Sequence, residues 1–188
     1  MTALLDLPEV RERVHRVTVP DYHRLGQLGV ISEDVELLRG IIVDKMSKSP
    51  LHEFIAQKLM KLFARQIPEK FEVRREGPLT LADSEPEPDI SIVEGKPEDW
   101  LNSHPSRASV VIEIAISSLH LDRSKAEIYA EAAIPEYWLI RGDEYLVDVY
   151  RQPTNKGYVE RITLTANDTL KCGSIAELQI DLKEIFPQ

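Results

Sequence analysis

The chain has 188 residues, of which 43% are hydrophobic and 29% are charged, values that suit one globular domain with a substantial core. Its 32 acidic and 23 basic residues give a net charge of −9, which repels nucleic acid at long range unless basic groups cluster or cations intervene. The single cysteine, Cys172, excludes a disulfide framework and a cysteine-rich zinc site. Neither a membrane-length apolar run nor a signal-peptide pattern is present, so we expect a cytoplasmic protein with no membrane partner.

No repeat or low-complexity linker divides the sequence, so we expect a single domain over residues 1–188. Within it we distinguish a lead-in over 1–19, a core over about 32–151 and a C-terminal β extension over 152–188. The first predicted element is a short helix from Pro20 to about Gly29. Two strands follow in "DVELLRGIIVDKM", with their turn at Arg39-Gly40.

The segment "SPLHEFIAQKLMKLFARQI" predicts an amphipathic helix in which Ser49 caps the first turn and Pro50 takes the first helical position. Strands are predicted in "KFEVRREGPLTLAD", "PDISIVEG" and "ASVVIEIAIS", the last of them central and covered on both faces. A helix capped by Asp122 and a hairpin turning at Gly142-Asp143 complete the predicted series. This order predicts an α/β fold with a mixed sheet flanked by helices.

Asp89 stands at the start of a strand, where "EPEPDISIVE" changes from acids and prolines to apolar residues. Prolines are confined to the ends and edges of sheets, so the strand begins near this residue. Because successive side chains of a strand face opposite ways, Asp89 shares a face with Ser91 and Val93. The carboxylates of this stretch therefore form either a solvated collar or the approach to a site.

Glu113 interrupts an otherwise apolar, β-branched strand and shares a face with Val111 and Ala115. An unpaired buried carboxylate costs several kcal/mol, so this side chain needs a cation, a hydrogen-bond donor or a bound proton. A salt-bridged or edge-exposed structural role satisfies the same requirement, and both interpretations stay open at this point.

Lys125 would be the third helical residue if Asp122 caps its helix, and a cation there opposes the helix dipole by ~0.3–1 kcal/mol. The helix follows the strand of Glu113, so the ammonium could reach back to that carboxylate. A surface lysine that tolerates the dipole is the alternative. The coincidence of Asp89, Glu113 and Lys125 on consecutive elements favours a shared site.

Three segments in order, "PEPDISIV", "VVIEIAIS" and "DRSKAEIYAEAAIPEYWLI", resemble the PD-(D/E)XK nuclease superfamily. Within it, the chain from about Val17 to Arg151 resembles the bacterial family of restriction-endonuclease-like proteins of the Uma-two type. The resemblance implies a restriction-endonuclease-like core: a mixed central β-sheet flanked by helices, with an N-terminal helix and extra β-hairpins.

The superfamily signature has Pro-Asp and then, on the next strand, an acid, any residue and a lysine. Asp89 and Glu113 match this pattern, whereas Ala115 stands at the lysine position. The resemblance implies that the lysine has moved to the following helix, where Lys125 fits. A long side chain can deliver its ammonium to one point from either backbone origin.

The resemblance implies a divalent-metal site for Mg²⁺ or Mn²⁺, with Asp89, Glu113 and the backbone carbonyl of Ile114 as ligands. Oxygen ligands of this kind suit a hard cation, which lowers the pKa of an attacking water. Lys125 would orient that water or stabilise developing charge on the phosphate. His52 and Glu36 are further candidate catalytic residues. Each has an equally weighted structural alternative, and the "LLRGII" around Glu36 departs from the family's usual "LIDGEI".

We therefore expect a metal-dependent endonuclease that hydrolyses phosphodiester bonds, with DNA as the substrate. Double-strand cutting needs two sites, which a homodimer would supply. Two alternatives stay open: a catalytically inactive nuclease fold that binds nucleic acid or a protein, and a metal-dependent hydrolase of small phosphate esters. No residues are assigned to nucleic-acid binding.

Overall fold

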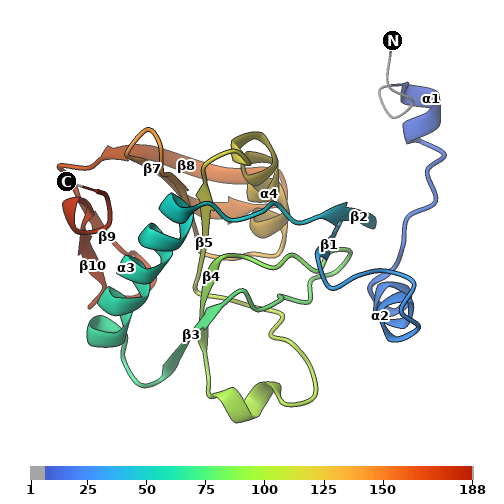
Figure 1. Ribbon diagram of the computed structural model, residues 1–188, viewed down its shortest axis with the longest axis horizontal. Helices are drawn as coiled ribbons and strands as arrows, with labels where there is room; N and C mark the ends of the chain where they lie inside the picture. Colours follow the sequence, from blue (N-terminus) through green and yellow to red (C-terminus); the bar gives the residue numbers. More distant parts are fainter. Residues whose placement is uncertain (1–6, 188) are drawn as a thin grey trace.

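A six-stranded mixed sheet organises the molecule, in the order β3-β4-β5-β6-β7-β8 (Figure 1). The computed structural model describes residues 7–187; the part of the predicted lead-in over residues 1–6 lies outside them. Neighbouring strands run antiparallel except β5 and β6, which are parallel. The strands are β3 (Phe71–Arg75), β4 (Ile90–Glu94), β5 (Val110–Ala115), β6 (Glu136–Arg141), β7 (Leu146–Thr154) and β8 (Gly157–Thr165).

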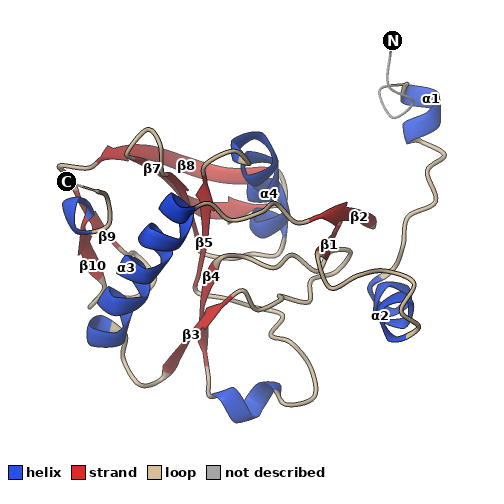
Figure 2. Ribbon diagram, in the orientation of Figure 1, coloured by secondary structure: helices blue, strands red, loops and turns tan. Residues whose placement is uncertain are grey.

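Two helices cover opposite faces of this sheet (Figure 2). Helix α3 (Pro50–Gln66) packs with Ile90, Ile112 and their neighbours of the same strand face. Helix α4 (Leu119–Glu131) packs on the other face, where Val111 and Ala115 belong to a separate apolar cluster. The predicted alternation of faces is thus confirmed, and it places Glu113 on the side of α4.

The predicted cap of α4 is wrong. The helix begins at Leu119, three residues before Asp122, with Ser118 at the N-cap position. Asp122 instead accepts a hydrogen bond from the Ser118 hydroxyl within the first turn. Lys125 therefore lies in the second turn and not in the first, so its conflict with the helix dipole, which weakens beyond the first turn, largely disappears.

Smaller elements flank the sheet. The predicted hairpin of β1 (Val35–Leu38) and β2 (Ile41–Asp44) turns at Arg39 and Gly40, both with positive φ. Helix α2 (Val19–Gln27) precedes it, and α1 (Pro8–Arg11) lies nearer the N-terminus. A second hairpin, β9 (Thr169–Lys171) with β10 (Gln179–Asp181), packs with α3 through the buried Leu170 and Ile180. Short 3₁₀ turns span Pro97–Trp100 and Leu182–Glu184.

The main sheet extends past residue 151, because β7 continues to Thr154 and β8 forms its edge. The predicted strand over 70–83 is shorter, ending at Arg75. Within residues 7–187, no helix combines the length and the apolar character that crossing a bilayer requires.

Candidate functional site

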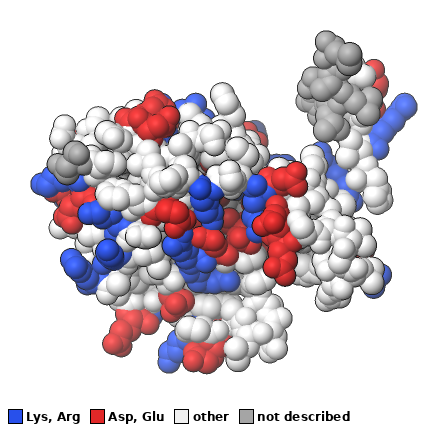
Figure 3. All heavy atoms as spheres, in the orientation of Figure 1, with Lys and Arg blue, Asp and Glu red and all other residues white. Residues whose placement is uncertain are grey.

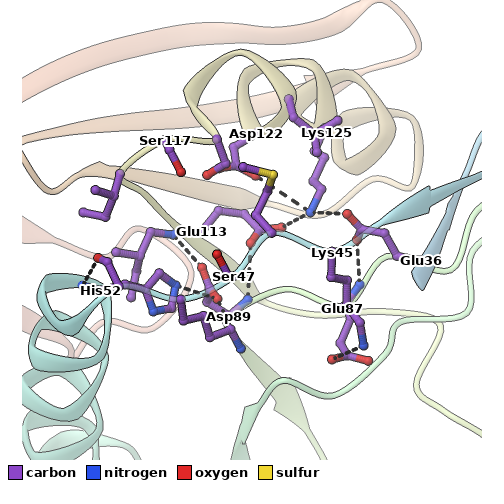
Figure 4. Close-up of a pocket in the computed structure, with 17 residues that line it drawn as sticks. Glu36, Lys45, Ser47, His52, Glu87, Asp89, Glu113, Ser117, Asp122 and Lys125 are labelled. Atoms are coloured by element: carbon purple, nitrogen blue, oxygen red, sulfur yellow. Dashed lines mark hydrogen bonds and ion pairs between the residues drawn. The ribbon is translucent and has the colours of Figure 1, made fainter. Parts of the chain in front are cut away.

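A polar pocket opens where the end of β5 meets the start of β4 (Figure 4). Seven parts of the chain contribute to it: β1, the segment 45–49, the first turn of α3, the segment before β4, the end of β5, the segment 116–118 and the first two turns of α4. Its charged or titratable side chains are Glu36, Lys45, Lys48, His52, Glu87, Asp89, Glu113, Asp122 and Lys125.

Asp89 is held from two sides. Its Oδ2 accepts the backbone N–H of Ile114 at 2.8 Å, and its Oδ1 lies 2.9 Å from His52 Nε2. The β4–β5 register pairs Ile90 with Ile112, so its continuation sets Asp89 opposite Glu113. The backbone N–H of Asp89 donates to Glu113 Oε2 at 3.3 Å, so the Glu113 side chain reaches the start of β4, next to Asp89.

Glu113 is almost fully buried under α4. Its Oε1 accepts hydrogen bonds from Lys125 Nζ at 3.1 Å and from the Tyr129 hydroxyl at 2.8 Å. Burial raises the pKa of Glu113 well above its usual range; Lys125 opposes this rise, and the charges of Asp122 and Asp89 add to it. The same carboxylate therefore meets one cation and several anions.

Lys125 is a buried lining residue of the pocket and is surrounded by carboxylates. Its ammonium lies 2.9 Å from Glu36 Oε1, 3.1 Å from Glu113 Oε1 and 3.8 Å from Asp122 Oδ1. Burial alone would lower the pKa of Lys125, but attraction to these carboxylates outweighs it and raises the pKa above the usual value. Lys125 thus stays protonated at neutral pH. Ala115, at the lysine position of the superfamily signature, is buried in the apolar cluster that includes Ala126, and its small side chain leaves Lys125 room to approach.

The pocket carries more negative than positive charge. Its lining includes five carboxyl groups and three lysines, a formal excess of two negative charges with every carboxyl group ionised. Burial and this repulsion also raise the pKa of Asp122, although Lys125 and the Ser118 hydroxyl lower it. A hard divalent cation would neutralise the excess, and carboxylate oxygens are its preferred ligands. The donor set therefore fits such an ion, although the described residues contain no ready-made group of three or more His, Cys, Asp or Glu ligands.

The backbone of Ile114 faces the same space. Its N–H reaches Asp89 past the end of β4. The N–H and C=O of one strand residue point to the same edge, so the Ile114 carbonyl is directed to this side as well. Ile114 lines the pocket. Its predicted role as a metal ligand stays a prediction.

His52 and Glu36 both lie in the pocket. His52 reaches Asp89 from the first turn of α3, which Ser49 caps by accepting the His52 N–H. Glu36, from β1, contacts Lys125 through Oε1 and accepts the backbone N–H of Glu87 through Oε2 at 3.2 Å. The structure thus brings together all the residues that the sequence singled out, whereas their catalytic roles stay predictions.

Four side chains that contact the predicted site residues or line the pocket were not predicted from the sequence as part of the site. Lys45 pairs with Glu87 at 3.1 Å, and Lys48 lies 3.9 Å from Asp89 Oδ1. Both belong to the polar segment between β2 and α3, which has no periodic pattern. The sequence did contain a signal for Asp122 and Tyr129. They stand three residues before and four residues after Lys125, and side chains at these spacings lie on the same face of a helix.

Comparisons with known proteins agree with this fold. A solved structure from Anabaena variabilis ATCC 29413, described as a putative nuclease belonging to DUF820, superposes with a TM-score of 0.74 at 21% sequence identity. The alignment covers 90% of this chain and 97% of that one. No curated protein matches. The sequence pattern of the Uma2 family, described as "Putative restriction endonuclease", matches residues 19–183. The chain therefore belongs to the Uma2 family of restriction-endonuclease-like proteins.

Proposed function

We propose that this chain hydrolyses phosphodiester bonds in DNA with the help of a divalent cation, Mg²⁺ or Mn²⁺. The observation that carries the proposal is the convergence of Asp89, Glu113 and Lys125 in one pocket whose carboxyl groups outnumber its lysines by two. The family description supports a nuclease in general. The metal and the DNA substrate are our own inference.

Asp89, Glu113 and the Ile114 carbonyl would hold the cation, which when bound supplies charge neutralisation at the phosphate and a more acidic water. His52 fixes the orientation of Asp89 by contacting Oδ1, while the Ile114 N–H holds Oδ2. Tyr129 does the same for Glu113. Both proposed carboxylate ligands are thus set in place by neighbours, the arrangement that keeps metal-binding side chains oriented.

Lys125 would serve as a fixed positive charge. Burial lowers the pKa of Lys125, but attraction to Glu113, Glu36 and Asp122 outweighs it and favours the charged ammonium. A buried ammonium stabilises negative charge that develops on the phosphate oxygens in the transition state. Glu36 holds that ammonium from the side away from Glu113. We assign Glu36 a positioning role.

Of the two alternatives, the inactive nuclease fold is disfavoured by the charge set itself. Keeping five acids and a buried lysine in one pocket costs stability, because like charges repel and each buried ion loses hydration. A protein that only binds a partner has no need of that arrangement. Phosphodiester hydrolysis uses each element of it.

The test is nicking of supercoiled plasmid by the purified chain, with Mg²⁺, with Mn²⁺ and with a chelator. We expect nicking only with metal, and metal binding itself appears as a rise in melting temperature, since a ligand at ten times its Kd adds about 1.4 kcal/mol to the free energy of unfolding. Hydrolysis of a small phosphodiester but not of plasmid would favour the hydrolase of small esters. The proposal would be contradicted if metal left the melting temperature unchanged and the plasmid stayed intact.

A further inference from the structure

The exposed side of α3 carries a row of cations. Phe54, Lys58, Lys61 and Arg65 recur at the three- and four-residue spacing that places side chains on one face of a helix, and all four are exposed. The only acid on this helix is Glu53, which is paired with Arg75. We call Lys58, Lys61 and Arg65 the α3 basic row.

These cations are not used to hold the fold together. Within residues 7–187, none of the three forms an ion pair, and Lys58 lies over the Phe54 ring at 5.4 Å. The row borders a groove whose opposite wall includes Lys183, Glu184 and Phe186. In a chain of net charge −9, this leaves a surface where positive charge is locally in excess. Figure 3 shows mixed charges around the pocket and further basic atoms over α3.

The row is connected to the candidate site by the helix itself. His52 stands in the first turn of α3, at the pocket, and the helix runs away from it (Figure 1). At 1.5 Å per residue, Lys58 lies roughly 9 Å along the axis from His52, and Lys58 to Arg65 spans roughly 10 Å. One strand of duplex DNA presents a phosphate about every 3.4 Å of axis, so the row matches about three phosphates.

We propose that the α3 basic row binds the phosphate backbone of the nucleic acid on one side of the bond to be cut. This inference rests on the proposed function and assigns it a substrate-binding surface. Contacts to phosphates supply affinity without base recognition, so the row would position any sequence equally. The row would also offset the repulsion between DNA and a chain of net negative charge, because its cations are the groups that contact the phosphates.

The test measures binding of a duplex of about 20 base pairs by fluorescence anisotropy, in chelator, over about 50 to 250 mM KCl. The variant Lys58→Gln, Lys61→Gln, Arg65→Gln should lose about 10²-fold in affinity near 0.1 M salt. Its slope of log K against log salt should be smaller by about 2–3, the value for three lost phosphate contacts. The variant Lys96→Gln, Arg107→Gln, Lys156→Gln removes the same charge elsewhere and should bind like the parent.

A charge-preserving variant, Lys58→Arg, Lys61→Arg, Arg65→Lys, should retain parental affinity and salt slope, which separates loss of charge from loss of fold. Parental binding by the glutamine variant, or a parent that binds no duplex, would overturn the inference. The inference would also be overturned if the glutamine variant bound DNA like the parent but no longer bound phosphatidylserine vesicles. That result would assign the row to a membrane surface. Failure of plasmid nicking with the salt slope reduced as expected would instead contradict the proposed function alone.

Discussion

Two buried carboxylates lie in one row across the sheet, but the charges around them have opposite signs. Glu113 on β5 pairs with Leu139 on β6, which pairs with Asp148 on β7, so the two acids share the face under α4. Two strand spacings, roughly 10 Å, separate them. Helix α4 sends Lys125 to the first acid and Arg123 toward the second.

Around Asp148 positive charge is in excess. Its Oδ2 lies 2.8 Å from Arg161, 3.9 Å from Arg123 and 4.0 Å from Arg141, and Thr163 donates to its Oδ1 at 2.6 Å. Around Glu113 acids are in excess, because Lys125 is the shared partner of Glu113, Glu36 and Asp122. A buried acid is therefore no evidence of a site by itself. What distinguishes the pocket is that its acids outnumber its cations.

Among these variants, we expect the largest effect from removing one carboxylate from the pocket. Asp89→Asn should abolish metal-dependent nicking, by roughly 10³-fold or more, because a proposed metal ligand is lost. Since it also relieves repulsion, the free energy of unfolding should be unchanged or slightly higher. Plasmid nicking and urea denaturation test the two halves. An unfolded variant would make Asp89 a structural cap, and retained nicking would remove it from the site.

Lys125→Met should act on both properties at once. It removes a fixed positive charge that we expect to be worth about 10² in rate. It also leaves Glu36 and Glu113 without their cation, which should cost about 3 kcal/mol in the free energy of unfolding. Adding Glu36→Gln should recover part of the stability and none of the rate. Recovery of both, measured by nicking and urea denaturation, would reduce Lys125 to a structural ion-pair partner.

Asp148→Ala should show the reverse pattern, with stability lost and chemistry kept. Removing the acid leaves Arg161, Arg123 and Arg141 facing each other, and we expect a loss of about 2–3 kcal/mol because these guanidiniums are partly exposed. Nicking per folded molecule should match the parent below the melting temperature. A large rate loss in fully folded Asp148→Ala would place this cluster in the catalytic machinery and end the contrast.

Cys172 gives the smallest expected effect. It lies beside Glu136, another acid held by donors, and burial together with the Glu136 charge raises the thiol pKa to about 12. The folded state therefore keeps a proton that the unfolded thiol releases near pH 8.5. This contribution is present below about pH 8.5 and is lost as the pH rises, by about 2 kcal/mol at pH 10. Cys172→Ser, compared with the parent by urea denaturation at about pH 7 and about pH 10, should reduce the difference by this amount. The buried tyrosines Tyr129, Tyr137 and Tyr158, whose pKa values burial also raises, account for the difference that remains.

Much of this arrangement could be predicted from the sequence, because its causes are local. Alternation along a strand fixes the faces of Asp89 and Glu113, and Ser49 followed by Pro50 fixes the start of α3. The start of α4 was predicted too late because Asp122 is a good capping residue by type. Its side chain instead accepts the Ser118 hydroxyl and faces Lys125.

The remaining features depend on contacts between distant segments. That Glu36 and Glu113 share Lys125 requires β1 and β5 both to approach α4, which no periodicity in these segments indicates. The pairing of Lys48 with Asp89 likewise joins residues 41 positions apart. The α3 basic row could not be predicted from composition, because a net charge of −9 is a sum over the whole chain and does not show where positive charges cluster.

The turn between β1 and β2 has a consequence for engineering this protein. Arg39 adopts a left-handed φ of 50°, a conformation that asparagine or glycine adopts more easily. Its guanidinium nevertheless forms a two-pronged contact with Glu131 at 2.8 and 2.9 Å, which ties the hairpin bearing Glu36 to the helix bearing Lys125. A search for stabilising substitutions that scored backbone conformation alone would select Arg39 for replacement. That replacement would remove one of the contacts between two walls of the pocket, so Arg39 is a residue that a designer should leave unchanged.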